Sequence, residues 1–139
     1  TRYVEWMENL PLYLETPGYL FVHAGIDTAL ASPLSDHRSL LWARGWEHTL
    51  DRDWLGDRIL IHGHTPTDRM LIENNAANAR ENQVVCIDAG ACTPSAESGM
   101  CAFELGSHWV YFEDLIRESG LRVGYSAFKE SLKRALGLL

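Results

Sequence analysis

In the stretch Tyr19-Leu20-Phe21-Val22-His23-Ala24-Gly25-Ile26, an apolar run ends in a histidine and then in small residues. The same order returns in Ile59-Leu60-Ile61-His62-Gly63-His64-Thr65-Pro66. A short apolar run that breaks at a glycine predicts a buried strand followed by a tight turn. We therefore expect strands over residues 19–23 and 58–62, each with an imidazole where the chain enters a loop.

The histidines at these two strand ends, His23 and His64, are candidate metal ligands. Neutral imidazole is a good ligand for Mn²⁺, Fe or Zn²⁺, and a rigid strand end fixes the direction of the side chain. A single histidine in such a place more often only hydrogen-bonds to the backbone. Two histidines in matching strand, histidine and glycine contexts favour a metal site.

Four short segments follow one another in a recognisable order: FVHAGI at 21–26, LLWAR at 40–44, GHTP at 63–66 and CIDAGA at 86–91. Together they resemble the second half of bacterial phosphoprotein phosphatases of the calcineurin-like metallophosphoesterase superfamily. Symmetrical diadenosine tetraphosphatases share these segments. The resemblance runs from about residue 10 to about residue 112, and its strength lies in the order of the four segments rather than in any one of them.

The resemblance implies an α/β fold with two packed mixed β-sheets flanked by helices, of which residues 1–139 would be one partial domain. It implies a dinuclear centre of divalent ions, with Mn²⁺ expected and Fe or Zn as alternatives. His23 and His64 match the histidines that bind one of the two ions in that family. The implied reaction is hydrolysis of a phosphomonoester or phosphoanhydride by a metal-activated hydroxide.

Arg44 matches the phosphate-contacting arginine of the family's LW-x-R segment, and its guanidinium fork suits two phosphoryl oxygens. The alternative is an arginine at a helix end that pairs with Glu47 or Asp51. His62 could chelate together with His64, because residues two apart in a strand point the same way. The family pattern has no ligand there, so we interpret His62 as a supporting or bystander residue.

Asp88 follows the third apolar run and matches a residue that is mainly structural near the family's site. It could orient a ligating histidine without touching the metal. The family more often has threonine where this chain has Ala89, so a hydroxyl contact is lost there. We therefore expect Asp88 to support the site rather than to take part in catalysis.

The family places Asp-x-His, Gly-Asp-x-x-Asp and Gly-Asn-His elements before the VHAG segment, and residues 1–22 contain none of them. We therefore expect this chain to be the C-terminal part of a longer enzyme and to be inactive by itself. The leading expectation for the parent is a serine/threonine protein phosphatase. The alternatives are a symmetrical dinucleoside tetraphosphatase and, in another class, a non-catalytic truncated domain.

The composition of the chain limits the classes of substrate and binding partner that we expect. A net charge of −7 argues against nucleic acid and anionic membranes, so we expect a phosphorylated protein or a small phosphoester or nucleotide as substrate. Three cysteines in irregular positions do not form a disulfide framework, which favours a cytoplasmic setting. A sheet edge left uncovered by the missing part would favour self-association.

The remaining pattern predicts further elements. We expect helices over residues 2–10 and about 35–44, the second capped by Ser35, and a C-terminal amphipathic helix over 126–139. We expect strands at 70–72, 83–88, 100–105 and 108–112, with the last two forming a hairpin. The asparagine-rich residues 73–82 are expected to form a solvent loop, and His37, His48 and His108 to lie at the surface.

Overall fold

The computed structural model of the protein describes residues 2–92 and 98–114. The helices and 3₁₀ turns of this part are α1 (Arg2–Glu8), η1 (Pro33–Ser35), α2 (His37–Trp42), η2 (Glu47–Thr49), α3 (Arg52–Leu55), α4 (Arg69–Ala77) and α5 (Ala79–Asn82). The strands are β1 (Tyr13–Thr16), β2 (Tyr19–Val22), β3 (Ile59–His62), β4 (Val84–Cys86), β5 (Gly99–Phe103) and β6 (Val110–Asp114).

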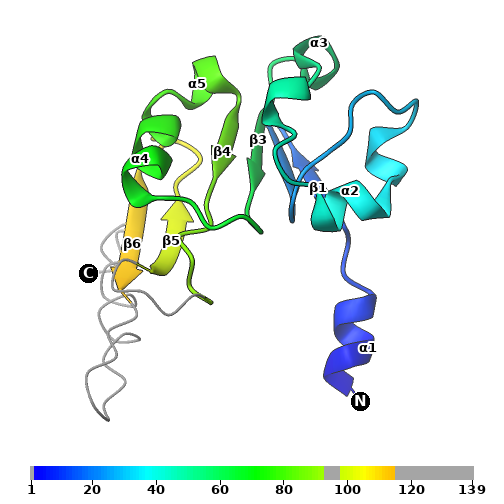
Figure 1. Cartoon of the computed structure of the whole chain (residues 1–139), viewed down its shortest axis with the longest axis horizontal. Helices are drawn as coiled ribbons and strands as arrows, with labels where there is room; N and C mark the ends of the chain where they lie inside the picture. Colours follow the sequence, from blue (N-terminus) through cyan, green and yellow to red (C-terminus); the bar gives the residue numbers. More distant parts are fainter. Residues whose placement is uncertain (1, 93–97, 115–139) are drawn as a thin grey trace.

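The strands form a mixed four-stranded sheet and a separate two-stranded one, which makes the protein α/β as expected (Figure 1). The order in the larger sheet is β1-β2-β3-β4, with β1 antiparallel to β2 and with β2, β3 and β4 parallel. Strands β5 and β6 pair antiparallel. The parallel arrangement of β2 and β3 puts the loops that leave them at the same end of the sheet.

Successive side chains along a strand point to opposite faces of the larger sheet, and both faces are buried. Leu20 and Leu60 point toward α2 and α3, where they join a core that includes Leu40 and Trp46. Tyr19 and Ile61 point to the other face, toward α5 and the β5–β6 hairpin. Figure 1 shows the resulting layers, with the sheet between α2 and α3 on one side and α4, α5, β5 and β6 on the other.

The β5–β6 hairpin is fastened to the larger sheet through Tyr19. The Tyr19 hydroxyl donates to the carbonyl of Leu105 and lies 3.1 Å from Nε2 of His108. The His108 ring is also stacked on Phe103, with centroids 5.5 Å apart. His108 was expected at the surface, and instead it is half-buried because it fills the junction between the two sheets.

Five of the six expected strands are confirmed to within two residues at each end, the exception being the one at 70–72. Strand β1 was not predicted. β1 is the end strand of its sheet, and three of its four residues are exposed. Such a strand lacks the buried apolar face that makes a strand recognisable in sequence. Only the turn at Pro17-Gly18, where Gly18 has a φ of +82°, marks the hairpin that joins it to β2.

The expected strand at 70–72 and loop at 73–82 are both wrong, because helices α4 and α5 occupy these residues. The carboxylate of Asp68 caps α4 by accepting from the backbone N–H groups of Met70 and Leu71. Ile72 and Ala76, one helical turn apart, are buried against the sheet. The apolar spacing of the helix was hidden among asparagines, which individually favour turns.

One helix start also differs from expectation. Asp36, not Ser35, caps α2, and its carboxylate accepts from the N–H groups of Arg38 and Ser39. The polar residues between Trp46 and Trp54, for which no element was predicted, form η2 and the start of α3. The helix expected over 126–139 lies outside the described residues. Across the described chain, no helix is both long and apolar enough to cross a membrane.

Candidate functional site

His23 and His64 meet at the end of the sheet where the parallel strands β2 and β3 terminate. Nε2 of His23 lies 3.2 Å from Nδ1 of His64, and the ring centroids are 5.0 Å apart. A backbone hydrogen bond of 2.9 Å from the Gly63 N–H to the His23 carbonyl holds the two loops together. The fold therefore brings together the two histidines that the sequence singled out.

The separation of the two nitrogens fits two chemical states. One imidazole can donate an N–H to the other, which is the state that an apo site would hold. Two nitrogens bound to one tetrahedral ion at Zn–N distances of about 2.0–2.1 Å would lie roughly 3.3 Å apart. The pair is thus arranged as two ligands of a single ion would be.

The surroundings of His64 favour its neutral form. Burial first, and then the positive charges of Arg44 and His23, lower the pKa of His64, while the charge of Asp88 acts in the opposite direction. A histidine must be neutral to bind a metal, because the ligating nitrogen has to offer its lone pair. The site therefore presents His64 in the form that a metal ion requires.

The backbone at His64 is strained. Its φ is +66°, and the Thr65 N–H donates to the Gly63 carbonyl at 2.8 Å, so His64 is the middle residue of a tight three-residue turn. Residues with a side chain adopt this left-handed region at a cost of about 1–3 kcal/mol. Strain of this kind is concentrated at functional sites, where it aims a side chain that a relaxed turn would direct elsewhere.

The loop after β2 is held by Trp46 and α2. The Trp46 indole N–H donates to the Ala24 carbonyl at 3.1 Å, and the Ala24 N–H donates to the Leu40 carbonyl at 2.8 Å. These two bonds fix the chain directly after His23. Apart from its apolar character, nothing in the sequence around Trp46 indicates this role.

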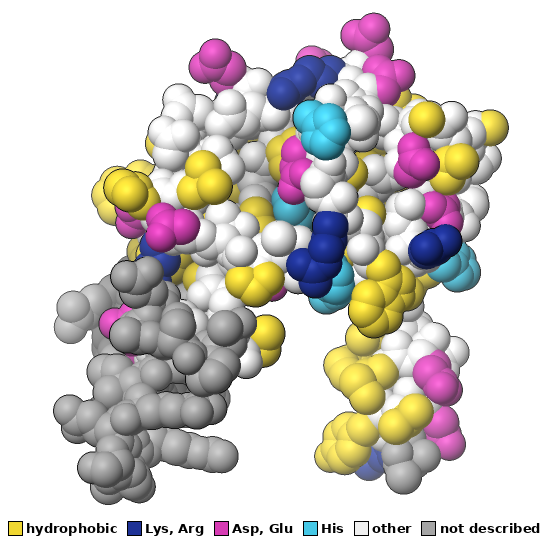
Figure 2. Space-filling model, in the orientation of Figure 1, with side chains coloured by type: hydrophobic (Ala, Val, Ile, Leu, Met, Phe, Trp, Pro, Cys, Tyr) yellow, Lys and Arg dark blue, Asp and Glu magenta, His cyan; other side chains and the backbone are white. Residues whose placement is uncertain are grey.

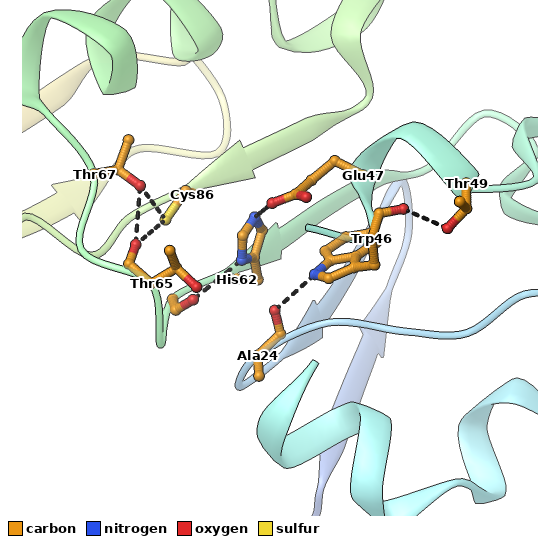
Figure 3. Close-up of polar contacts among 9 residues, drawn as sticks. Ala24, Trp46, Glu47, Thr49, His62, Thr65, Thr67 and Cys86 are labelled. Carbon is orange, nitrogen blue, oxygen red and sulfur yellow. Dashed lines mark hydrogen bonds and ion pairs between the residues drawn. The ribbon is translucent and has the colours of Figure 1, made fainter. Parts of the chain in front are cut away.

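His62 faces the protein interior. It is 4% exposed, its Nδ1 lies 3.2 Å from the Gly63 carbonyl, and its ring meets Trp46 edge-on at 5.1 Å (Figure 3). Nε2 is 3.9 Å from a carboxylate oxygen of Glu47. Burial is the largest effect on the pKa of His62 and lowers it. His62 and His64 thus contact different neighbours.

Arg44 is exposed in the loop after α2, close enough to His64 for its charge to lower the pKa of that imidazole. The ion pairs found in the described residues do not include Arg44. The two carboxylates considered as its partners are engaged elsewhere: Glu47 lies near His62, and Asp51 caps α3. Its guanidinium is therefore available to an anion at the site.

Asp88 shapes the loop after β4. Its Oδ1 accepts from the Gly90 N–H at 2.9 Å, and its carbonyl accepts from the Thr67 N–H at 2.8 Å. The first bond shapes the loop itself, and the second ties it to the loop that carries His64. Asp88 also favours the charged form of His64 by its negative charge, which places it beside the pair without making it a ligand.

Trp42 is a site residue that the sequence motifs do not single out. Its ring meets that of His64 edge-on, with centroids 5.6 Å apart and planes at 90°, and 68% of the residue is exposed. The signal available in the sequence was its position two residues before Arg44.

Figure 2 shows histidine side chains (cyan) beside a cationic one (dark blue) near the middle of one face of the molecule.

No family model, curated protein or solved structure matches this chain. Within residues 2–92 and 98–114, no group of three or more His, Cys, Asp or Glu side chains is arranged to hold a metal ion. In the described residues, the site brings together the two imidazoles, an arginine and a tryptophan. Within that part of the chain, the carboxylates that a dinuclear centre would need are not grouped with the histidine pair.

Proposed function

We propose that this chain is part of a metal-dependent phosphoesterase of the calcineurin-like type, in which His23 and His64 bind one divalent ion. The observation that carries the proposal is the 3.2 Å approach of their ring nitrogens at adjacent parallel strand ends. The order of the four sequence segments supports the family. The guanidinium of Arg44, which forms no ion pair within the described residues, supports a phosphorylated substrate.

Each residue has a defined part in this proposal. A divalent ion at the pair would polarise phosphoryl oxygens and activate an attacking water. Arg44 binds two phosphoryl oxygens through its guanidinium and offsets the charge that grows on them. Trp46 holds the loop after His23 through its indole N–H, which donates to the Ala24 carbonyl. Asp88 holds the loop that carries His64 through its carbonyl, which accepts from the Thr67 N–H.

The ions would be Mn²⁺, with Fe or Zn²⁺ as alternatives, because all three accept imidazole ligands. A second ion would need carboxylate or amide ligands beyond the two histidines. Two neutral imidazoles cannot hold two dications close together against their repulsion. We therefore expect this chain alone to bind a single ion and to have no phosphatase activity, which agrees with the non-catalytic alternative for the isolated polypeptide.

Phosphoserine or phosphothreonine proteins and dinucleoside tetraphosphates are both candidate substrates of the complete enzyme. They present the same phosphoryl oxygens, and the histidine pair with Arg44 would treat these alike. A protein phosphatase is the leading proposal from the sequence segments, with the tetraphosphatase as its alternative.

The proposal is tested by metal binding, because this readout does not depend on a complete active site. Calorimetric titration of the chain with Mn²⁺ and with Zn²⁺ should give one site, which His23→Ala and His64→Ala each remove. His37→Ala is the matched control, since His37 is an exposed histidine at the start of α2. Equal binding by all three variants would rule out the pair as a metal site.

A further inference from the structure

Trp42 places a large aromatic surface in solvent beside the proposed phosphate site. It is 68% exposed, whereas Trp46, four residues later, is 6% exposed in the core. Trp42 is not part of either buried cluster of the described chain. A flat apolar ring next to an exposed arginine is a combination that suits a ligand with both a planar and an anionic part.

The position of Trp42 is fixed by the fold. It is the last residue of α2, and Leu40 in the same helix is completely buried. The Ala24 N–H bonds to the Leu40 carbonyl, so the end of α2 is attached to the loop that begins with His23. The backbone at Trp42 is thus fixed relative to the loop that carries His23, as a binding surface requires.

The arrangement also orders the ligand groups in space. The Trp42 ring stands next to His64, and His64 stands next to His23, with centroid separations of 5.6 and 5.0 Å. Arg44 follows Trp42 by two residues and is exposed in the loop after α2. An anion bound by Arg44 and the histidines would therefore lie close to the indole ring of Trp42.

We propose that Trp42 stacks against the nucleobase of a nucleotide substrate whose phosphate is held at Arg44 and the histidine pair. This inference rests on the proposed function, and it favours a nucleoside phosphate over a phosphoprotein. In a nucleotide, a ribose separates the planar base from the phosphate. This spacing matches the Trp42 ring, the proposed stacking platform, which lies beside the phosphate site. A phosphoserine side chain has no planar group to stack, and the ring of phosphotyrosine is joined directly to its phosphoryl oxygen.

Base stacking on an aromatic side chain tolerates any base, because every base has a π face. The platform would thus select for a nucleotide without selecting strongly among adenine, guanine and the pyrimidines. Stacking of this kind typically strengthens binding by about tenfold or more per base. AMP should accordingly bind about ten times more tightly than ribose 5-phosphate, which has the same phosphate and sugar but no base.

The test measures binding by calorimetry of the whole chain in the presence of Mn²⁺. The probes are AMP, ribose 5-phosphate, inorganic phosphate, adenosine and phosphotyrosine. Trp42→Ala removes the platform, and Trp42→Phe keeps a smaller one. Trp109→Ala is the matched control, because Trp109 is 67% exposed between β5 and β6.

We expect the wild-type chain to bind AMP about ten times more tightly than ribose 5-phosphate. Trp42→Phe should show nearly the same preference for AMP, and Trp109→Ala should show an unchanged one. Trp42→Ala should bind the two compounds equally and keep its affinity for inorganic phosphate. Any one of four results would overturn the proposal. In the wild-type chain, these are equal binding of AMP and ribose 5-phosphate, no binding of AMP, or tighter binding of phosphotyrosine than of AMP. The fourth is a preference for AMP that persists in Trp42→Ala.

The same titrations separate this inference from the proposed function. If phosphate and ribose 5-phosphate bind and AMP binds no more tightly than they do, the phosphoester site is supported and the stacking role of Trp42 is ruled out. Adenosine that binds in a Trp42-dependent manner, while no phosphate binds, would keep the platform and remove the phosphoester site.

Discussion

Gly25 lies directly against the indole of Trp46, so closely that a Cβ built on Gly25 would stand 1.9 Å from the indole nitrogen. That nitrogen donates to the carbonyl of Ala24, the residue that follows His23. The contact explains in physical terms why a glycine is needed after the first candidate ligand. A side chain there would displace the indole that holds the loop.

Gly25→Ala should therefore destabilise the fold by about 2–3 kcal/mol, because it overpacks the core and breaks the bond from Trp46 to Ala24. Urea unfolding followed by tryptophan fluorescence would measure the change. Gly63→Ala is the control, since a Cβ there would meet its nearest atoms at 3.6 and 3.8 Å, in ordinary contact. Similar losses in both variants would contradict the assigned role of the Trp46 contact.

The strained turn at His64 predicts an unusual order of stability among its variants. His64→Gly should be more stable than His64→Ala by about 1 kcal/mol, because glycine adopts a φ near +66° without the steric cost that alanine retains. Chemical denaturation of the two variants measures this difference directly. An alanine variant at least as stable as the glycine variant would show that the turn is relaxed in solution.

The thiols should differ in reactivity. Burial, and after it the charge of Cys86, raises the pKa of Cys101 to about 11 from the usual 9.0, whereas Cys92 is exposed. At about pH 8, Cys92 should react rapidly with a disulfide reagent, and Cys101 should react mainly after unfolding. Mass spectrometry of the labelled peptides would assign the sites, and rapid labelling of Cys101 in the folded chain would contradict its burial.

The same shift has a consequence for stability. A thiol whose pKa is raised on folding binds its proton more tightly in the folded state. The contribution of the Cys101 thiol to the free energy of unfolding is therefore fully present below pH 9.0, and it is lost as the pH rises through about 11. In Cys101→Ala, the free energy of unfolding should fall less steeply over this pH range than in the wild-type chain.

Arg44→Ala should weaken the binding of inorganic phosphate at least tenfold while leaving the stoichiometry of bound Mn²⁺ unchanged. The reason is that the guanidinium contacts phosphate oxygens and does not ligate the ion. Calorimetry with Mn²⁺ first and phosphate second separates the two effects. Arg38→Ala, at an exposed arginine of α2, is the control. Loss of the metal from Arg44→Ala would instead indicate a structural role for this residue.

The end strand β1 predicts self-association. Tyr13 and Leu14 of β1 are 38% and 55% exposed at the edge of the larger sheet. Exposed apolar edge strands pair readily with a second copy, so we expect a concentration-dependent dimer in sedimentation experiments. Leu14→Lys should weaken it markedly. Met70→Lys, which changes a 75% exposed residue of α4, should not, and equal weakening by both would point to nonspecific association.

The amino-acid sequence alone is enough to predict the strands that are buried. Apolar runs at Tyr19–Val22 and Ile59–His62 are sufficient to predict β2 and β3, because burial on both faces requires nearly continuous apolar residues. It also predicted the presence of His23 and His64 at strand exits. These features are local, so the order of neighbouring residues carries them.

Features that depend on partners distant in the sequence were decided by the tertiary structure. The edge strand β1 and helix α4 were missed, because their recognition requires knowing which sheet face lies beside them. Likewise, the approach of His23 to His64, the packing of Trp46 against Gly25 and the exposure of Trp42 follow from the parallel pairing of β2 with β3 and from the docking of α2. Residues some 40 positions apart are brought within hydrogen-bonding distance only by that pairing, for which no local pattern exists.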